Sequence, residues 1–117
     1  MRAAQTAFLI QLLEARSGFP FPDSLRQLYL TGGSADTDAV RLLSLSEVTI
    51  MLDNWPRYGF APGYLPIAED DKGDLYCIRC RPPHQAHVFH LRWTGEDLDQ
   101  FGDVEQFVKA MLSPPAE

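Results

Sequence analysis

Apolar residues recur every three or four positions near the N-terminus, which is the spacing of one helix face. This stripe consists of Ala4, Phe8, Leu9, Leu12 and Leu13. It ends at Ser17-Gly18, where glycine favours the left-handed conformation that closes many helices. The pattern predicts an amphipathic helix over residues 1–17.

A second segment with helical spacing begins at Pro22, a residue that suits the first turn of a helix. Leu25, Leu28 and Tyr29 share one face of this helix. Gly32-Gly33 can supply its C-terminal cap. No Lys-Ser or Lys-Thr pair follows these glycines, so we interpret them as a cap rather than as a phosphate-binding loop.

Two more helices are predicted further along the chain. Ser46 is a good N-cap for the third helix, and Pro56 stops that helix because proline disfavours the helical conformation of the residue before it. Asp103 can cap the last helix, over residues 104–112, whose apolar positions again match the helical spacing.

The middle of the chain is predicted to form strands. Arg41–Leu45 is a short candidate, and Tyr64–Ala68, Asp74–Cys80 and Ala86–Trp93 are three longer ones. Pro66 has no backbone donor, so it indicates an edge position or a bulge. Helices at both chain ends and strands between them favour an α+β fold, with an antiparallel-rich central sheet and the helices packed on it.

The length and composition fit one globular domain. With 117 residues, 45% of them hydrophobic and 22% charged, we expect a single domain over residues 1–117 with a frayed tail at 113–117. Two cysteines are too few for a disulfide framework. Gln11, Glu14 and Arg16 interrupt the N-terminal apolar run, so we expect no export signal, no membrane span and a cytoplasmic location.

The net charge of −6 argues against nucleic acid and anionic membranes as partners, because both need a basic surface. It is compatible with a basic protein partner. Residues 1–58 have a net charge of −1 and residues 59–117 a net charge of −5. The excess lies in the segments AEDDKGD and GEDLDQFGD, so we expect any charged binding surface to be built from them. We expect a monomer or a weak homodimer.

The segment AEDDKGDLYCI places four carboxylates within six residues. They do not follow the spacing of a calcium loop, which needs glycine sixth and glutamate twelfth. A hairpin fits better, because Asp71 and Gly73 suit its turn. Glu69, Asp70 and Asp74 are then either solvated or part of a binding surface. In both cases we expect that reversing Glu69 and Asp70 to lysine leaves the fold intact.

Cys77 and Cys80, followed by three histidines, have the residue types of a zinc site. In a regular strand an offset of three places the two cysteine side chains on opposite faces, and the same holds for His87 and His90. A bend at Pro82-Pro83 can still gather some of them, so zinc stays open as an alternative, but we predict no metal and no cofactor. No Gly-x-Ser-x-Gly elbow occurs, and no catalytic residue is predicted.

Five segments occur together in one order along the chain. They are FPFPDSLRQLYLTGG, LLSLSEV, YLPIAEDDKGDLYCI, HVFHLRW and DVEQFVKAMLS. In this order, from Phe19 to Leu112, they resemble the SUKH superfamily. The residues that match its pattern are Leu25, Leu28, Tyr29, Gly32, Gly33, Leu43, Ser46, Glu47, Val48, Pro66, Ile67, Ala68, Asp70, Gly73 and Asp74.

The resemblance implies an α+β domain without a catalytic role. Bacterial members of this superfamily typically serve as immunity proteins that bind and neutralise a cognate toxin, often a nuclease, and eukaryotic relatives act as regulatory adaptors. We therefore expect a cognate protein toxin as partner, with an intracellular adaptor and a small metal-dependent enzyme as alternatives. The candidate partner-binding residues are Glu69, Asp70, Asp74, Trp93, Glu96, Asp97 and Asp99.

Overall fold

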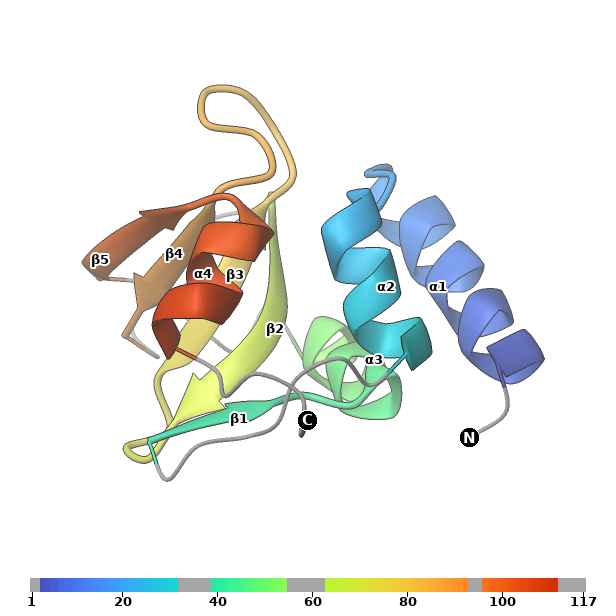
Figure 1. The fold of residues 1–117 in the computed structure, drawn as a ribbon, viewed down its shortest axis with the longest axis horizontal. Coiled ribbons are helices and arrows are strands. Elements are labelled where there is room, and N and C mark those ends of the chain that lie inside the picture. The colour runs from blue at the N-terminus through green and yellow to red at the C-terminus, as the bar shows by residue number, and fades with distance from the viewer. Residues whose placement is uncertain (1–2, 32–38, 55–62, 93–95, 112–117) are drawn as a thin grey trace.

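Four helices and five strands make up the part of the chain that the structure describes (Figure 1). The structure is a computed structural model, and it describes residues 3–31, 39–54, 63–92 and 96–111. The elements in chain order are α1 (Ala3–Ser17), α2 (Asp23–Thr31), β1 (Val40–Leu42), α3 (Leu45–Asp53), β2 (Tyr64–Asp70), β3 (Leu75–Arg79), β4 (Val88–Leu91), β5 (Asp97–Gly102) and α4 (Val104–Met111).

The five strands form one antiparallel sheet in the order β1-β2-β3-β4-β5, so each strand pairs with the strand before or after it in sequence. Helices α1 and α2 precede the sheet and α4 follows it, so the predicted α+β fold is confirmed. The register between β2 and β3 shifts between Pro66 and Ala68. This confirms the predicted bulge at Pro66, in a strand that has neighbours on both sides.

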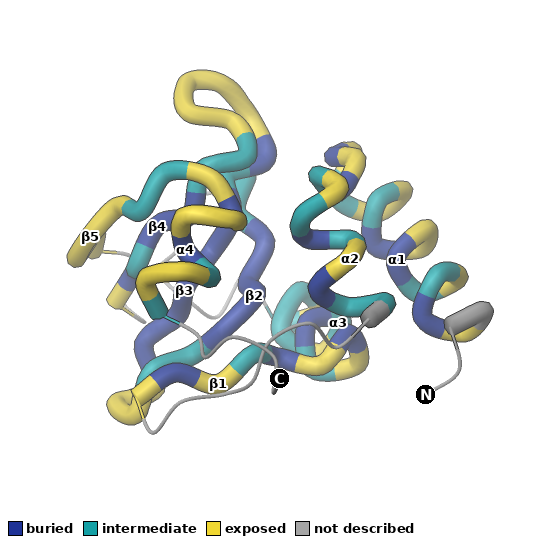
Figure 2. The backbone as a smooth tube through the Cα atoms, in the orientation of Figure 1, coloured by how far each residue is buried: buried dark blue, intermediate teal, exposed yellow. Residues whose placement is uncertain are grey.

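The hydrophobic core lies between the sheet and the helices. Figure 1 shows the strands curling around α4, while α1, α2 and α3 form a group beside β2. Phe107 of α4 is fully buried, and its ring centroid lies 5.1 Å from that of Tyr76 in β3. Figure 2 shows burial along β2 and β3 and exposure along β5 and the β3–β4 loop. Strand β5 is therefore the solvent-facing edge of the sheet.

Helix α1 forms over almost the predicted range, but part of its predicted face is wrong. Ile10 and Leu13 are buried, whereas Phe8 and Leu12 are 59% and 51% exposed. Residues 7–10 and 12–13 are apolar on all sides of the helix, so the periodicity alone cannot select the buried face. None of the described helices is long and apolar enough to cross a membrane.

Side-chain caps start two of the helices. Ser44, not the predicted Ser46, caps α3: the Glu47 N–H donates to Ser44 Oγ (3.1 Å), and the Ser44 N–H donates to Glu47 Oε1 (3.0 Å). This is a capping box, which needs a glutamate three residues after the cap, and only Ser44 has one. Asp103 is confirmed as the cap of α4, since its Oδ1 accepts from the Gln106 N–H at 2.9 Å.

Two predicted helix ends lie outside the described residues, namely the cap at Gly32-Gly33 and the stop at Pro56. Helix α2 is described up to Thr31. Helix α3 ends at Asp53, where the N–H of the C-cap Asn54 donates to the Ile50 carbonyl.

The sequence pattern does not predict β5, because its first four residues are all exposed and lack the alternation of a half-buried strand. The strand pairs with β4 from Val88 opposite Gly102 to Leu91 opposite Asp97. The predicted strand Ala86–Trp93 is shorter in the structure, since Ala86 has a φ of +70° and does not take an extended conformation.

Candidate functional site

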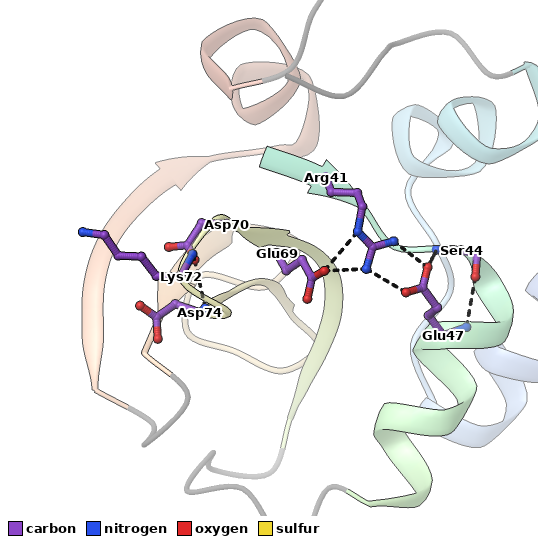
Figure 3. Close-up of polar contacts among 7 residues, drawn as sticks. All are labelled: Arg41, Ser44, Glu47, Glu69, Asp70, Lys72 and Asp74. Carbon is purple, nitrogen blue, oxygen red and sulfur yellow. Dashed lines mark hydrogen bonds and ion pairs between the residues drawn. The ribbon is translucent and has the colours of Figure 1, made fainter. Parts of the chain in front are cut away.

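Asp70 organises the acidic turn between β2 and β3. The N–H groups of Lys72 and Asp74 both donate to Asp70 Oδ1, each at 2.9 Å (Figure 3). Gly73 has a φ of +86°, so its predicted role in the turn is confirmed. The predicted role of Asp71 is wrong, because its neighbour Asp70 supplies the carboxylate that accepts the N–H groups of the turn, while Asp71 is exposed.

The second oxygen of Asp70 ties the turn to β4. His90 Nε2 lies 2.8 Å from Asp70 Oδ2, and the two side chains are only 18% and 10% exposed. Burial raises the pKa of Asp70, but the hydrogen bonds from His90, Lys72 and Asp74 outweigh it and hold this pKa below its usual value. Asp70 is therefore a part of the folded turn and offers little free surface.

Glu69 is held in an ion cluster with Arg41 and Glu47. Arg41 and Glu69 are directly opposite each other on β1 and β2, and Arg41 Nε donates to Glu69 Oε1 at 3.0 Å. The other side of the guanidinium donates to both carboxylate oxygens of Glu47, at 2.9 and 2.7 Å. Figure 3 shows Arg41 between the two carboxylates. The hydrogen bonds of Arg41, followed by that of the Ser44 N–H, lower the pKa of Glu47 to about 2.

These contacts divide the predicted acidic residues into two groups. Asp70 and Asp74 are largely withdrawn from solvent, and the charge of Glu69 is paired with Arg41. The premise that Glu69 and Asp70 have no role in the fold is contradicted, because both carboxylates bind residues of other strands. We therefore now expect their reversal to lysine to destabilise the fold. Glu96, Asp97 and Asp99 are exposed, and Trp93 lies outside the described residues.

The exposed acids meet at one end of the sheet. Asp99 is opposite His90, which binds Asp70, and Asp97 is opposite Leu91, which pairs with Leu75 beside the turn. Burial raises the pKa of the Tyr76 hydroxyl to about 12, and nearby carboxylates add to the rise. These carboxylates belong to Asp70, Asp71, Asp99 and Asp74. We call the exposed acids Asp71, Glu96, Asp97 and Asp99 the acidic end.

One group of potential metal ligands occurs within the described residues. Ligand atoms of Asp70, Asp74 and His90 all lie within 4.8 Å of one another. The hydrogen bond between His90 and Asp70, and the two N–H groups that Asp70 accepts, account for this proximity without an ion.

The cysteines do not join that group. Cys77 and Cys80 are both buried, and the thiol of Cys80 donates to the Ile78 carbonyl with an S···O distance of 3.8 Å. Burial raises the pKa of Cys77, and it raises that of Cys80 to about 11. Zinc binds the thiolate form, which this environment disfavours.

Sequence reasoning does not identify Arg41 or His90 as partners of the acidic turn. Arg41 is 28 positions from Glu69, and His90 is 20 positions from Asp70. Strand pairing alone brings Arg41 next to Glu69 and His90 next to Asp70, so no local sequence pattern predicts these contacts. The one local signal is the Ser44-to-Glu47 spacing of the capping box.

A comparison with known protein families identifies the chain. The SMI1 / KNR4 family (SUKH-1) matches residues 6–110, which runs from α1 to α4. The chain belongs to this family. The resemblance to the SUKH superfamily noted in the sequence is thereby confirmed. No curated protein and no solved structure shows significant similarity to the chain.

Membership of SUKH-1 bears on what the acidic end can do. The family includes toxin-immunity proteins, and its domains are generally non-enzymatic and bind partner proteins. In this SUKH-1 chain Asp97 and Asp99 lie on the edge strand β5, Glu96 directly precedes it and Asp71 lies in the β2–β3 turn, all exposed and accessible to another protein. The arrangement is suited to electrostatic recognition of a basic surface.

Proposed function

We propose that this SUKH-1 protein is a cytoplasmic immunity protein that binds a basic protein toxin and neutralises it. The observation that carries the proposal is the acidic end, four exposed carboxylates in the β2–β3 turn, in β5 and directly before β5. The net charge of −6 and the membership of SUKH-1 support the same conclusion.

The acidic end acts through charge complementarity. A toxin that cleaves nucleic acid needs a basic surface for phosphates, and carboxylates can occupy the places of those phosphates. Glu96, Asp97 and Asp99 then contact the toxin, and Trp93, which is close to them in sequence, adds an aromatic contact. Glu69, Asp70 and Asp74 contribute indirectly, because their contacts hold the turn and β1 in place.

Stoichiometry tests the proposal. A candidate toxin, chosen as the product of a gene that neighbours the gene of this protein, is assayed for its own activity at rising amounts of this protein. We expect suppression to be complete near one equivalent, and no hydrolase or nuclease turnover by the protein alone. Suppression far below one equivalent indicates a catalyst, and no suppression by excess protein favours an intracellular adaptor instead. Either result contradicts the proposal.

The role of the acidic end is tested with the double variant Asp97→Asn/Asp99→Asn. Exposed charges at the rim of an interface mainly set the association rate, so we expect severalfold slower association and a weaker dependence on salt in stopped-flow measurements. The matched control is Gln5→Lys/Gln11→Lys, which makes the same change in net charge at exposed positions of α1. If both double variants slow association equally, the effect comes from the net charge in general, and the acidic end is not part of the interface.

A further inference from the structure

A groove of about 400 Å³ lies between helices α2 and α4. The most buried of its lining residues is Leu28 of α2, and Ser24 of α2 and Val108 of α4 are partly buried. The apolar side chains of Leu28 and Val108 form its floor. Its exposed charged residues are Asp23 of α2 and Glu105 and Lys109 of α4, which form its rim. The volume is near the lower limit of the roughly 300–1,000 Å³ range of ligand sites, so the groove fits one long side chain rather than a helix.

The two carboxylates of the rim are available to a cationic group. Asp23 and Glu105 lie in the first turns of their helices, where the helix dipole stabilises negative charge. Among the described residues, neither of them is in an ion pair. The nearest cation along α2, Arg26, lies 2.8 Å from Glu14 of α1 and is thus engaged with another helix.

An apolar floor with a carboxylate on each wall fits a particular kind of side chain. Arginine and lysine carry an aliphatic stem that packs on apolar surface and a charged end that stays at the rim. An acidic side chain meets two like charges there. A purely apolar side chain satisfies the floor but leaves the carboxylates without a partner.

We propose that the groove binds one arginine or lysine side chain of the protein partner. Its stem packs on Leu28 and Val108, and its cation pairs with Asp23 and Glu105. The inference rests on the proposed function in that the side chain comes from the bound toxin. Lys109, four residues after Glu105, opposes this occupant and limits its affinity.

The position of the groove is compatible with one partner that also covers the acidic end. Helix α4 contacts β5 on one side and α2 on the other, so the groove is one helix away from the edge strand. Figure 1 shows this order, with α4 between β5 and α2. A partner that contacts Asp97 and Asp99 can therefore extend across α4 to the groove.

Small analogues test the groove without the toxin. Methyl-labelled full-length protein is titrated with n-butylguanidinium, with the neutral near-isostere n-butylurea and with the anion pentanoate, and NMR shifts of Leu28 and Val108 are followed. We expect saturable shifts with n-butylguanidinium, and binding of n-butylurea that is about tenfold weaker, the effect of losing one charge-assisted contact. Equal binding of the cation and the urea, or stronger binding of pentanoate, overturns the proposal.

Variants then assign the cation contact to the rim. We expect Asp23→Asn/Glu105→Gln to weaken n-butylguanidinium binding about tenfold and Lys109→Gln to strengthen it. The matched control, Asp97→Asn/Asp99→Asn, removes the same charge from β5 and should leave these shifts unchanged. An equal loss in the control variant contradicts the proposal. Failure of toxin suppression with intact guanidinium binding removes only the proposed function, so the two failures are distinguishable.

Discussion

Asp70 and Asp71 are neighbours with the same side chain in opposite environments. Asp70 accepts two backbone N–H groups and contacts His90, and its side chain is 10% exposed. Asp71 follows in the turn with an exposed side chain. Because a buried N–H without an acceptor costs far more than an exposed one, the two positions should respond very differently to truncation.

The first prediction compares Asp70→Ala with Asp71→Ala. Asp70→Ala leaves the N–H of the buried Asp74 without its acceptor, so we expect a loss of about 1–3 kcal/mol in the free energy of unfolding. Asp71→Ala should change it by less than about 0.5 kcal/mol. Urea denaturation followed by circular dichroism measures both. A larger loss for Asp71→Ala contradicts the assignment of the turn to Asp70.

The same carboxylate predicts a pH dependence. The folded pKa of Asp70 is below its ordinary value, so its ionised form is favoured by folding. The resulting stability is fully present above the unfolded pKa of about 3.9 and is lost as the pH falls through the folded pKa. The stability gap between wild type and Asp70→Ala should therefore be widest near neutral pH and narrow below about pH 4. A gap that widens on acidification contradicts this.

Helix α3 shows how one element is fixed by both local and distant contacts. Ser44 and Glu47 cap the helix locally, and the same glutamate binds Arg41 of β1, which also binds Glu69 of β2. Glu47 therefore joins the helix start to two strands. The lowered pKa of Glu47 reflects first Arg41 and then the Ser44 N–H.

Two serines near the start of α3 provide the next test. Ser44→Ala removes the oxygen that accepts the Glu47 N–H, and we expect a cost of about 0.5–2 kcal/mol in the free energy of unfolding. Ser46→Ala is the matched control, because Ser46 is exposed and lies inside the helix, where alanine is favourable. Thermal and urea unfolding of the two variants decides the point. If Ser46→Ala is the more destabilising change, Ser44 is not the cap.

The whole molecule combines one hydrophobic core with charges segregated at its periphery. The core residues extend from α1 and α2 through the sheet to α4, and both cysteines are among them. The described histidines lie on β4 and on the β3–β4 loop, and His90 is hydrogen-bonded to Asp70. The fold therefore separates the residue types that a zinc site would have to gather.

A metal analysis tests this at the level of the intact protein. We expect purified protein to contain no stoichiometric zinc and its melting temperature to be unaffected by chelators, because the buried cysteines have raised pKa values and do not converge with the histidines. Elemental analysis and thermal melts with and without EDTA measure this. If the protein contains about one zinc per chain and unfolds when a chelator removes it, the prediction is wrong and the chain has a zinc site.

Local patterns determined the elements whose residues signal their own structure. The helices were predictable from apolar spacing and, for α4, from the Asp103 cap, and the β2–β3 turn from Gly73, whose positive φ suits glycine. The order of helices and strands was enough for the fold class. The bulge at Pro66 also followed from a local cause, the missing N–H of proline.

Tertiary structure alone decided which of these residues work together. The exposed face of α1, the strand β5 and the contacts of Asp70 and Glu69 all depend on elements far away in sequence. In α1 the apolar residues 7–10 and 12–13 surround the helix, and β5 is exposed along its first four residues, so only packing reveals which α1 face is buried and that β5 is a strand. The acidic segment was visible in the sequence, but strand pairing separated the carboxylates that hold the fold from those that face solvent, because a carboxylate with a cross-strand partner is no longer free for a second protein.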